Sequence, residues 1–239
     1  MWLREIEARN YKQAYVAQHY DVVASIYREA YNDELIERDP CARIMRPKVH
    51  AASQRREVLT ALELAAYLKT ARELGPSEHA IAALAVMGLR ATEMASLRVE
   101  ALSQSRGYRI LNFMGNGGRP ARIPVPLPAL SAIEAAVDGR ESGPLLRTQA
   151  GAAMDRRAVH RYVARTAKVA GISRPISPHA LLRSVATAAL DHGIPLRDVQ
   201  RMLRHVRSDS TTRTYDIPGD QLERHASHQI AGFLAGFAS

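Results

Sequence analysis

The order of apolar and polar positions predicts a mostly helical chain. Two helices are expected in the first 47 residues, one over Leu3–Tyr15 and one over Asp21–Ile36. The first contains neither glycine nor proline, and the second repeats apolar side chains at roughly helical intervals. Pro40 removes a backbone donor and restricts Asp39 before it, so the second helix should end ahead of this pair.

A polar, basic stretch then separates this helical segment from the rest of the chain. It runs from Pro47 to Arg56, and Thr60 and Glu63 after it have the spacing of a capping box, which marks the start of a new helix. We therefore expect a helical segment over residues 1–47, a linker over 48–57 and a main domain over 58–239.

Within the main domain, helices should dominate around one β-hairpin. The hairpin signal is Gly115-Asn116-Gly117-Gly118, which lies between the strand candidates Tyr108–Phe113 and Arg122–Leu127. Pro178 after Ser177 has the pattern of a first helical residue after an N-cap. The fold class predicted is mainly α with a small antiparallel β element. The expected helices are Leu59 onward, Ser77–Met87, Thr92–Leu97, Ala129–Val137, Asp155–Ala170, Pro178–His192, Pro195–Leu203 and Gln221–Phe237.

Composition excludes several classes of protein. The single cysteine, Cys41, rules out a disulfide framework and a cysteine-based zinc site. No apolar run approaches the roughly 18 residues that span a bilayer, and no signal-peptide pattern opens the chain. The spacing of the histidines, without nearby cysteine or carboxylate ligands, argues against a metal site. We expect a cytoplasmic protein that uses neither a metal nor a cofactor and has no membrane partner.

The charge favours a polyanionic partner. Lysine and arginine total 33 against 24 aspartates and glutamates, the net charge is +9 and the isoelectric point is near 10. Arginine supplies nearly all of the positive charge, and its planar guanidinium suits bidentate phosphate contacts. Nucleic acid is the first candidate, and an arginine-rich codon bias is the alternative.

Three segments in a fixed order resemble the catalytic domain of the tyrosine recombinases, the phage integrase family. They are Gly88–Met94, then Ser177–Arg183, then Leu203–His205 followed by Thr211–Asp216. The hairpin, Gly143–Leu146 and Leu222–Ala226 extend this resemblance, in particular to integrases of actinobacterial phages. It covers about residues 40–237 and implies site-specific DNA recombination or integration.

The resemblance implies a role for each polar residue that matches the family motifs. Tyr215 attacks the scissile phosphorus and holds the DNA as a 3′-phosphotyrosine, while Arg90 binds the non-bridging oxygens and Glu93 braces the site. His179 and His205 donate hydrogen bonds or protons to the phosphate. Taken singly, each residue has a plainer interpretation, such as a solvated arginine at a helix start, a packed tyrosine ring or a histidine that caps a helix.

The sequence departs from the family pattern at two cationic positions. The second arginine of the family follows the histidine by three residues, where this chain has Leu182, with Arg183 one place later. The family's hairpin lysine falls at Asn116, which leaves Arg119 as the nearest substitute. A milder departure is the loop before Tyr215, which is one residue longer than usual. The segment 1–47 corresponds to part of the family's core-binding domain.

Two functions therefore remain open on this fold. One is a working strand-transfer enzyme, and the other is a catalytically impaired DNA-binding protein, such as a regulator or a remnant of a mobile element. A helical interaction module unrelated to nucleic acid is a third, weaker interpretation. Expected DNA contacts are Arg55, Arg56, Arg156, Arg157, Arg161 and Arg165, although the last four also fit an ordinary solvated helix face.

The C-terminal helix carries an apolar stripe. By resemblance it packs against a neighbouring protomer in a tetramer on double-stranded DNA, and packing on its own domain is the alternative. The stripe consists of Leu222, Ala226, Ile230, Phe233, Leu234 and Phe237.

Overall fold

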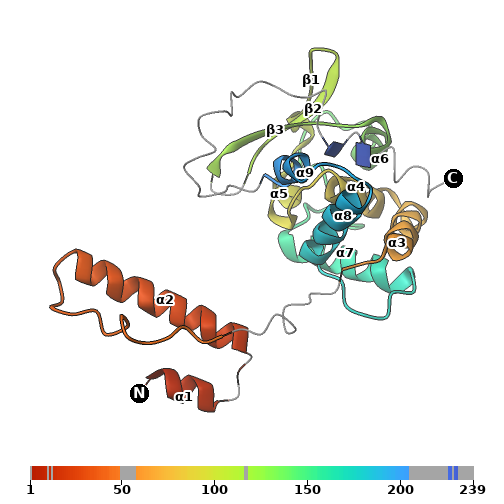
Figure 1. Ribbon diagram of the computed structural model, residues 1–239. Coiled ribbons are helices and arrows are strands. Elements are labelled where there is room, and N and C mark those ends of the chain that lie inside the picture. The colour runs from red at the N-terminus through yellow and green to blue at the C-terminus, as the bar shows by residue number, and fades with distance from the viewer. Residues whose placement is uncertain are drawn as a thin grey trace. The chain divides into compact units, whose positions relative to one another are not determined.

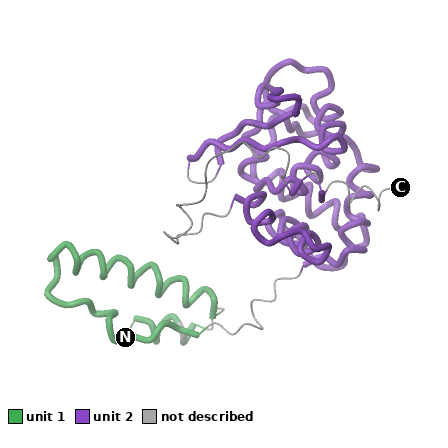
Figure 2. The backbone as a smooth tube through the Cα atoms, turned by 45° about the horizontal axis from the view of Figure 1, so that its top comes forward, with its two compact units in different colours: residues 1–57 green, residues 58–239 purple. Residues whose placement is uncertain are grey.

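The computed structural model describes residues 2–9, 11, 13–48, 58–115, 118–204, 226–227 and 229–230. The chain divides into two compact units, residues 1–57 and residues 58–239 (Figure 2). We call them unit 1 and unit 2 and describe each by itself.

The described residues of unit 1 form two helices, α1 (Trp2–Ala8) and α2 (Gln13–Asn32). The expected break between Tyr15 and Asp21 is wrong, because α2 runs through it without a glycine or proline to interrupt it. The expected end at Ile36 is also wrong. The helix stops at Asn32 because Glu34 takes a left-handed φ of 58° and the Leu35 N–H donates to the Ala30 carbonyl at 2.9 Å, as in a Schellman cap.

The loop after α2 returns along the helix. Arg46 donates two hydrogen bonds to the carboxylate of Asp21, at 2.7 and 2.8 Å, and the Tyr20 hydroxyl donates to the Ile44 carbonyl at 2.6 Å. The buried apolar side chains among the described residues of unit 1 are few and small. They are Val16, Ala17 and Ala24.

The helices of unit 2 begin where local capping chemistry places them. Thr60 and Glu63 form the predicted capping box, with the Glu63 N–H donating to Thr60 Oγ1 at 3.2 Å and the Thr60 N–H donating to Glu63 Oε2 at 2.8 Å. Ser177 caps the helix that starts at Pro178, as predicted. The helices are α3 (Ala61–Leu74), α4 (Pro76–Val86), α5 (Ala91–Ser96), α6 (Leu127–Val137), α7 (Arg156–Val169), α8 (Pro178–Asp191) and α9 (Leu196–Met202), with a 3-10 turn over Val99–Ala101.

A three-stranded antiparallel sheet replaces the single hairpin that the pattern predicts. Its strands are β1 (Leu102–Ser105), β2 (Tyr108–Met114) and β3 (Pro120–Pro124), in the order β1-β2-β3. The polar strand β1 was missed because its turn to β2 is Arg106-Gly107, with φ of 48° and 82°, and lacks an Asn-Gly signal. The last strand ends before Leu127, which begins α6.

The sheet and helices share one hydrophobic core. Leu111 pairs with Ile123 across β2 and β3, and both side chains are buried in that core. In Figure 1 the sheet lies at one end of unit 2, and α3, α4, α7 and α8 bundle below it. The predicted fold class, mainly α with a small antiparallel β element, is confirmed.

The C-terminal end of α9 lies directly against the loop before α5. Gly88 has a left-handed φ of 86°, and a Cβ atom there would be 2.7 Å from the Met202 carbonyl oxygen. Only a glycine permits this approach. The contact brings together segments that are more than a hundred residues apart and that carry two of the three motifs.

Four residues of the expected C-terminal helix are described, Ala226, Ser227, Gln229 and Ile230, and they are helical. Ala226 and Ile230 are each 1% exposed and belong to the core of unit 2. These two stripe residues therefore pack on their own domain. The other stripe residues lie outside the described part of the chain.

A bidentate ion pair ties the start of α3 to the chain before α8. Arg174 donates to both carboxylate oxygens of Glu63, at 2.6 and 2.7 Å, and to the Val58 carbonyl at 3.0 Å. The hydrogen bonds from Arg174, with the backbone hydrogen bond from Thr60, lower the pKa of Glu63 from its usual 4.5 to about 2.

We predict that Gly88→Ala lowers the free energy of unfolding by about 3 kcal/mol, because it adds a backbone clash to the strain of a left-handed φ. Gly107→Ala is the matched control, since Gly107 has a φ of 82° but no atom within 4 Å of the place that a Cβ would take. It should cost about 1 kcal/mol from strain alone. Urea denaturation measures both, and equal losses would contradict the close approach of α9.

We predict that Glu63→Gln destabilises the protein by about 2 kcal/mol at pH 7 and by progressively less as the pH falls. The folded-state pKa of about 2 lies below the usual 4.5, so the stabilisation is present above pH 4.5 and is lost as the pH falls through 2. Denaturation between pH 7 and pH 2 tests this. Glu73→Gln, an exposed glutamate of the same helix, is the control, and a pH-independent difference for Glu63→Gln would refute the linkage.

Candidate active site

Arg90 and Glu93 form a paired site at the start of α5. The Arg90 N–H donates to Glu93 Oε2 at 2.7 Å, and the Arg90 guanidinium donates from Nη1 to Glu93 Oε1 at 3.3 Å. Arg90 Nη2 also donates to the Leu203 carbonyl at 3.1 Å. The carboxylate of Glu93 is 3% exposed and the side chain of Arg90 is 27% exposed. The guanidinium of Arg90 is therefore partly exposed at the surface, and the buried carboxylate of Glu93 fixes its position.

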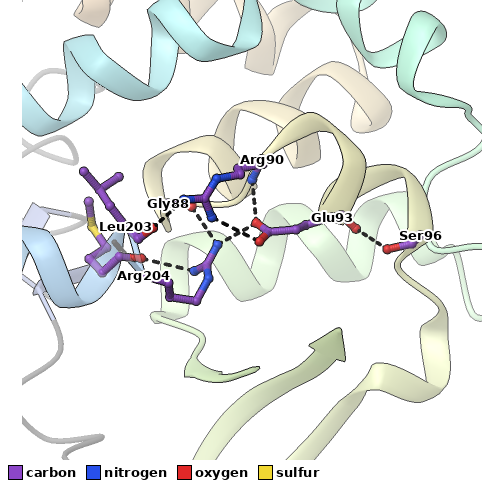
Figure 3. Close-up of polar contacts among 7 residues, drawn as sticks. Gly88, Arg90, Glu93, Ser96, Leu203 and Arg204 are labelled. Carbon is purple, nitrogen blue, oxygen red and sulfur yellow. Dashed lines mark hydrogen bonds and ion pairs between the residues drawn. The ribbon is translucent and has the colours of Figure 1, made fainter. Parts of the chain in front are cut away.

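A second arginine, Arg204, approaches the same carboxylate from the end of α9 (Figure 3). Its Nη2 donates to Glu93 Oε2 at 2.6 Å and to the Gly88 carbonyl at 2.9 Å, and its Nη1 donates to the Met202 carbonyl at 3.1 Å. Its guanidinium carbon lies 5.0 Å from the centre of the Phe113 ring, within the range of a cation–π contact.

Arg204 keeps its charge in a largely buried place. Its side chain is 18% exposed, and burial lowers the pKa of the guanidinium, an effect that Glu93 opposes and Arg90 reinforces. Arginine remains protonated despite such a shift. Sequence reasoning gave this residue no role, although it lies within the Leu203–His205 motif. Its φ of 51° is one that glycine would more often adopt.

The β2–β3 hairpin reaches the same cluster. Phe113 on β2 lies beneath Arg204, and a Cβ atom at Gly115 would be 3.7 Å from Glu93 Oε1. The Gly115 N–H donates to the Arg119 carbonyl at 2.7 Å, which closes the hairpin end, and the Arg119 side chain is exposed there. Asn116 lies outside the described residues. The end of β2 at Gly115 thus adjoins the Arg90–Glu93 pair.

On helix α8, Leu182 and Arg183 differ in burial. Leu182 is 5% exposed and belongs to the core. His179 is exposed and Arg183 is half-buried, and these two residues are four apart, so they lie on one face of α8. The helix packs against α4 and α9, and Ser184 accepts a hydrogen bond from the Leu59 N–H at 2.8 Å.

The expected nucleophile and several other residues lie outside the described part of the chain. They are Tyr215, His205, Arg55 and Arg56. The structure therefore joins Arg90 and Glu93 to the hairpin end and to Arg204. The meeting of these groups with Tyr215 stays a prediction.

The arginines of α7 are exposed to solvent. Arg157, Arg161 and Arg165 are four residues apart, so they form a stripe along one face, and Arg156 precedes them. Arg165 also lies 3.6 Å from the buried carboxylate of Glu78, so part of its charge has a partner inside the fold.

Within residues 2–48, 58–115, 118–204 and 226–230, apart from the gaps noted above, no three histidine, cysteine, aspartate or glutamate side chains gather as metal ligands would. In the same part of the chain, none of the helices combines the length and the apolar character needed to cross a bilayer.

Curated recombinases match almost the whole chain. Tyrosine recombinase XerD of Pseudomonas putida is 29% identical over 239 aligned positions, which cover 94% of this chain and 78% of that protein. Tyrosine recombinase XerC of Corynebacterium efficiens is 30% identical over 224 positions, which cover 90% of this chain and 70% of that protein.

Solved structures share the fold. A lambda integrase fragment, crystallised as a dimer bound to a COC′ core site, superposes with a TM-score of 0.65 at 20% identity and covers 87% of this chain and 77% of that one. The integrase of mycobacterium phage Brujita has a TM-score of 0.54 at 21% identity and covers 100% of this chain and 81% of that one. The family model described as "Phage integrase family" matches residues 57–220, and the chain therefore belongs to the phage integrase family of tyrosine recombinases.

Proposed function

We propose that this protein is a site-specific DNA recombinase that works in the cytoplasm, with Tyr215 as its nucleophile. The observation that carries the proposal is the cationic cluster at Arg90, built from two distant segments of a chain that belongs to a family of strand-transfer enzymes. Arg90 is more exposed than Arg204, the other cation of the cluster, and the buried carboxylate of Glu93 fixes its position.

In the proposed reaction the Tyr215 hydroxyl loses its proton and its oxygen attacks a DNA phosphorus. The bond from phosphorus to the 5′-oxygen breaks, that oxygen takes up a proton, and the DNA remains attached as a 3′-phosphotyrosine. A 5′-hydroxyl from another strand reverses these steps. Arg90 stabilises the charge that develops on the non-bridging oxygens, and His179 and His205 supply hydrogen bonds or protons.

Two arginines stand in for missing family cations in this proposal. Arg183 shares a face of α8 with His179, and Arg119 is exposed at the hairpin end beside the cluster. Arg119 stabilises charge but is a poor proton donor, because an arginine pKa lies above about 12. DNA lies along further arginines, Arg55, Arg56, Arg156, Arg157, Arg161 and Arg165.

A second function, a DNA-binding protein with impaired catalysis, is favoured by one observation. Leu182 is a core residue at the position where the resemblance expects the second arginine of the phosphate site. Such a protein would keep the basic surface but would form no covalent intermediate. The two functions differ in one measurable product, the protein–DNA adduct.

We further propose that the protein assembles on DNA through its C-terminal helix. One supporting point is that a lambda integrase has been solved as a tetramer bound to a Holliday junction. Since Ala226 and Ile230 already belong to their own domain's core, the contact with a neighbour falls to Leu222, Phe233, Leu234 and Phe237.

We predict that the protein forms an SDS-resistant adduct when it is incubated with fragmented, nicked DNA of the strain that encodes it. Tyr215→Phe should abolish the adduct, and Arg90→Met should reduce its yield by about a hundredfold or more. Tyr162→Phe is the matched control and should leave the yield unchanged. Peptide mass spectrometry locates the nucleotide, and sequencing of the captured fragments identifies the DNA site. Absence of any adduct from the wild-type protein, with DNA binding retained, would establish the second function instead.

We predict that Phe233→Ser combined with Phe237→Ser prevents multimers on the captured DNA while the melting temperature of the free protein stays within about 2 °C. Ile230→Ser should instead lower stability by about 3 kcal/mol, because it places a hydroxyl in the core. Mass photometry and thermal denaturation measure the two effects. Unchanged assembly of the double variant would show that the C-terminal helix is not the interface.

A further inference from the structure

The cluster at Arg90 contains more positive charge than a simple arginine–glutamate pair. Glu93 carries one negative charge, and both Arg90 and Arg204 contact its carboxylate. The ion pair with Arg204 is the shorter, 2.6 Å against 3.3 Å for the guanidinium of Arg90. The three charges sum to +1, whereas Arg90 and Glu93 alone would sum to zero.

The hydrogen bonds of Arg204 show how it acts. Its Nη atoms donate to Glu93, Gly88 and Met202, and its Nε is buried without a hydrogen-bond partner among the described residues. Phe113 covers one face of the guanidinium. With its donors directed inward, Arg204 does not offer them to an anion at the surface, which Arg90 can do.

We propose that Arg204 is a positioning residue of the phosphate site: it neutralises Glu93 and thereby leaves Arg90 with an uncompensated positive charge for a DNA phosphate. Without Arg204, the buried carboxylate has Arg90 as its remaining cation in the cluster and draws that guanidinium inward. The inference rests on the proposed function for the identity of the anion. Arg204 also places a second positive charge beside Arg90, in a chain that has Leu182 where the resemblance expects the second arginine of the phosphate site.

The test separates charge neutralisation from mere bracing of α9. Inorganic phosphate serves as the probe, titrated at low ionic strength and followed through the NMR signal of the Arg90 Nε–H group. Arg204→Met should weaken phosphate binding about tenfold, because the cluster becomes neutral. Arg204→Lys, which keeps the charge, should stay within about threefold of the wild type.

The decisive variant is the double change Arg204→Met with Glu93→Gln. It removes one positive and one negative charge and returns the cluster to +1, so phosphate binding should recover to within about threefold of the wild type. Arg140→Met is the matched control: Arg140 donates to the carbonyls of Ala136, Val137, Pro144 and Leu145, and its loss should lower stability without weakening phosphate binding.

If the double variant binds phosphate as weakly as Arg204→Met, or if Arg204→Met binds as tightly as the wild type, the proposal is wrong. This result is independent of the adduct assay. A protein that forms no adduct at Tyr215 but shows the rescue would keep the role of Arg204 and lose the proposed function. A protein that forms the adduct without the rescue would keep the proposed function and lose the role of Arg204.

Discussion

The candidate site depends on the contact between one buried carboxylate and two guanidinium groups. Glu93 is almost fully buried, and the desolvation of an isolated carboxylate would cost several kcal/mol. Its hydrogen bonds from the Arg90 backbone, the Arg90 guanidinium and the Arg204 guanidinium offset this cost. The start of α5 is thereby joined to the end of α9, and Arg90, the proposed phosphate-binding cation, is held by a carboxylate that solvent barely reaches.

The end of α9 and the β2–β3 hairpin pack closely around this carboxylate. The absence of a side chain at Gly88 lets the last turn of α9 approach. The hairpin end also lies near Glu93, since a Cβ atom at Gly115 would make an ordinary van der Waals contact with Glu93 Oε1 at 3.7 Å. Phe113 then occupies the space beside Arg204. Each of these contacts links parts of the chain that are distant in sequence, so the site exists only in the assembled unit 2.

Local signals predicted the parts of the fold that local chemistry determines. Thr60 and Ser177 marked helix starts that the structure confirms, because a cap is a contact between residues three apart. Strand β1 and the end of α2 escaped prediction, because their turns use Arg106 and Glu34 in left-handed conformations that no sequence rule assigns to these residues. The pairing of Arg90 with Glu93 is likewise a short-range contact, between two residues that the resemblance had singled out without expecting them to pair. Arg204 could not be found in this way, since its partner Glu93 lies 111 residues earlier in the chain.

The left-handed backbone at Arg204 has a consequence for how substitutions there would be judged. A glycine at this position would relieve about 1 kcal/mol of conformational strain while vacating the space over Phe113. Removing the guanidinium would also leave the buried Glu93 carboxylate with one cation fewer, at a cost of several kcal/mol that exceeds this relief, so the change would lower the melting temperature. Judged by backbone preference alone, residue 204 would be misclassified as a loop position that favours glycine, although the charge of its side chain decides the outcome.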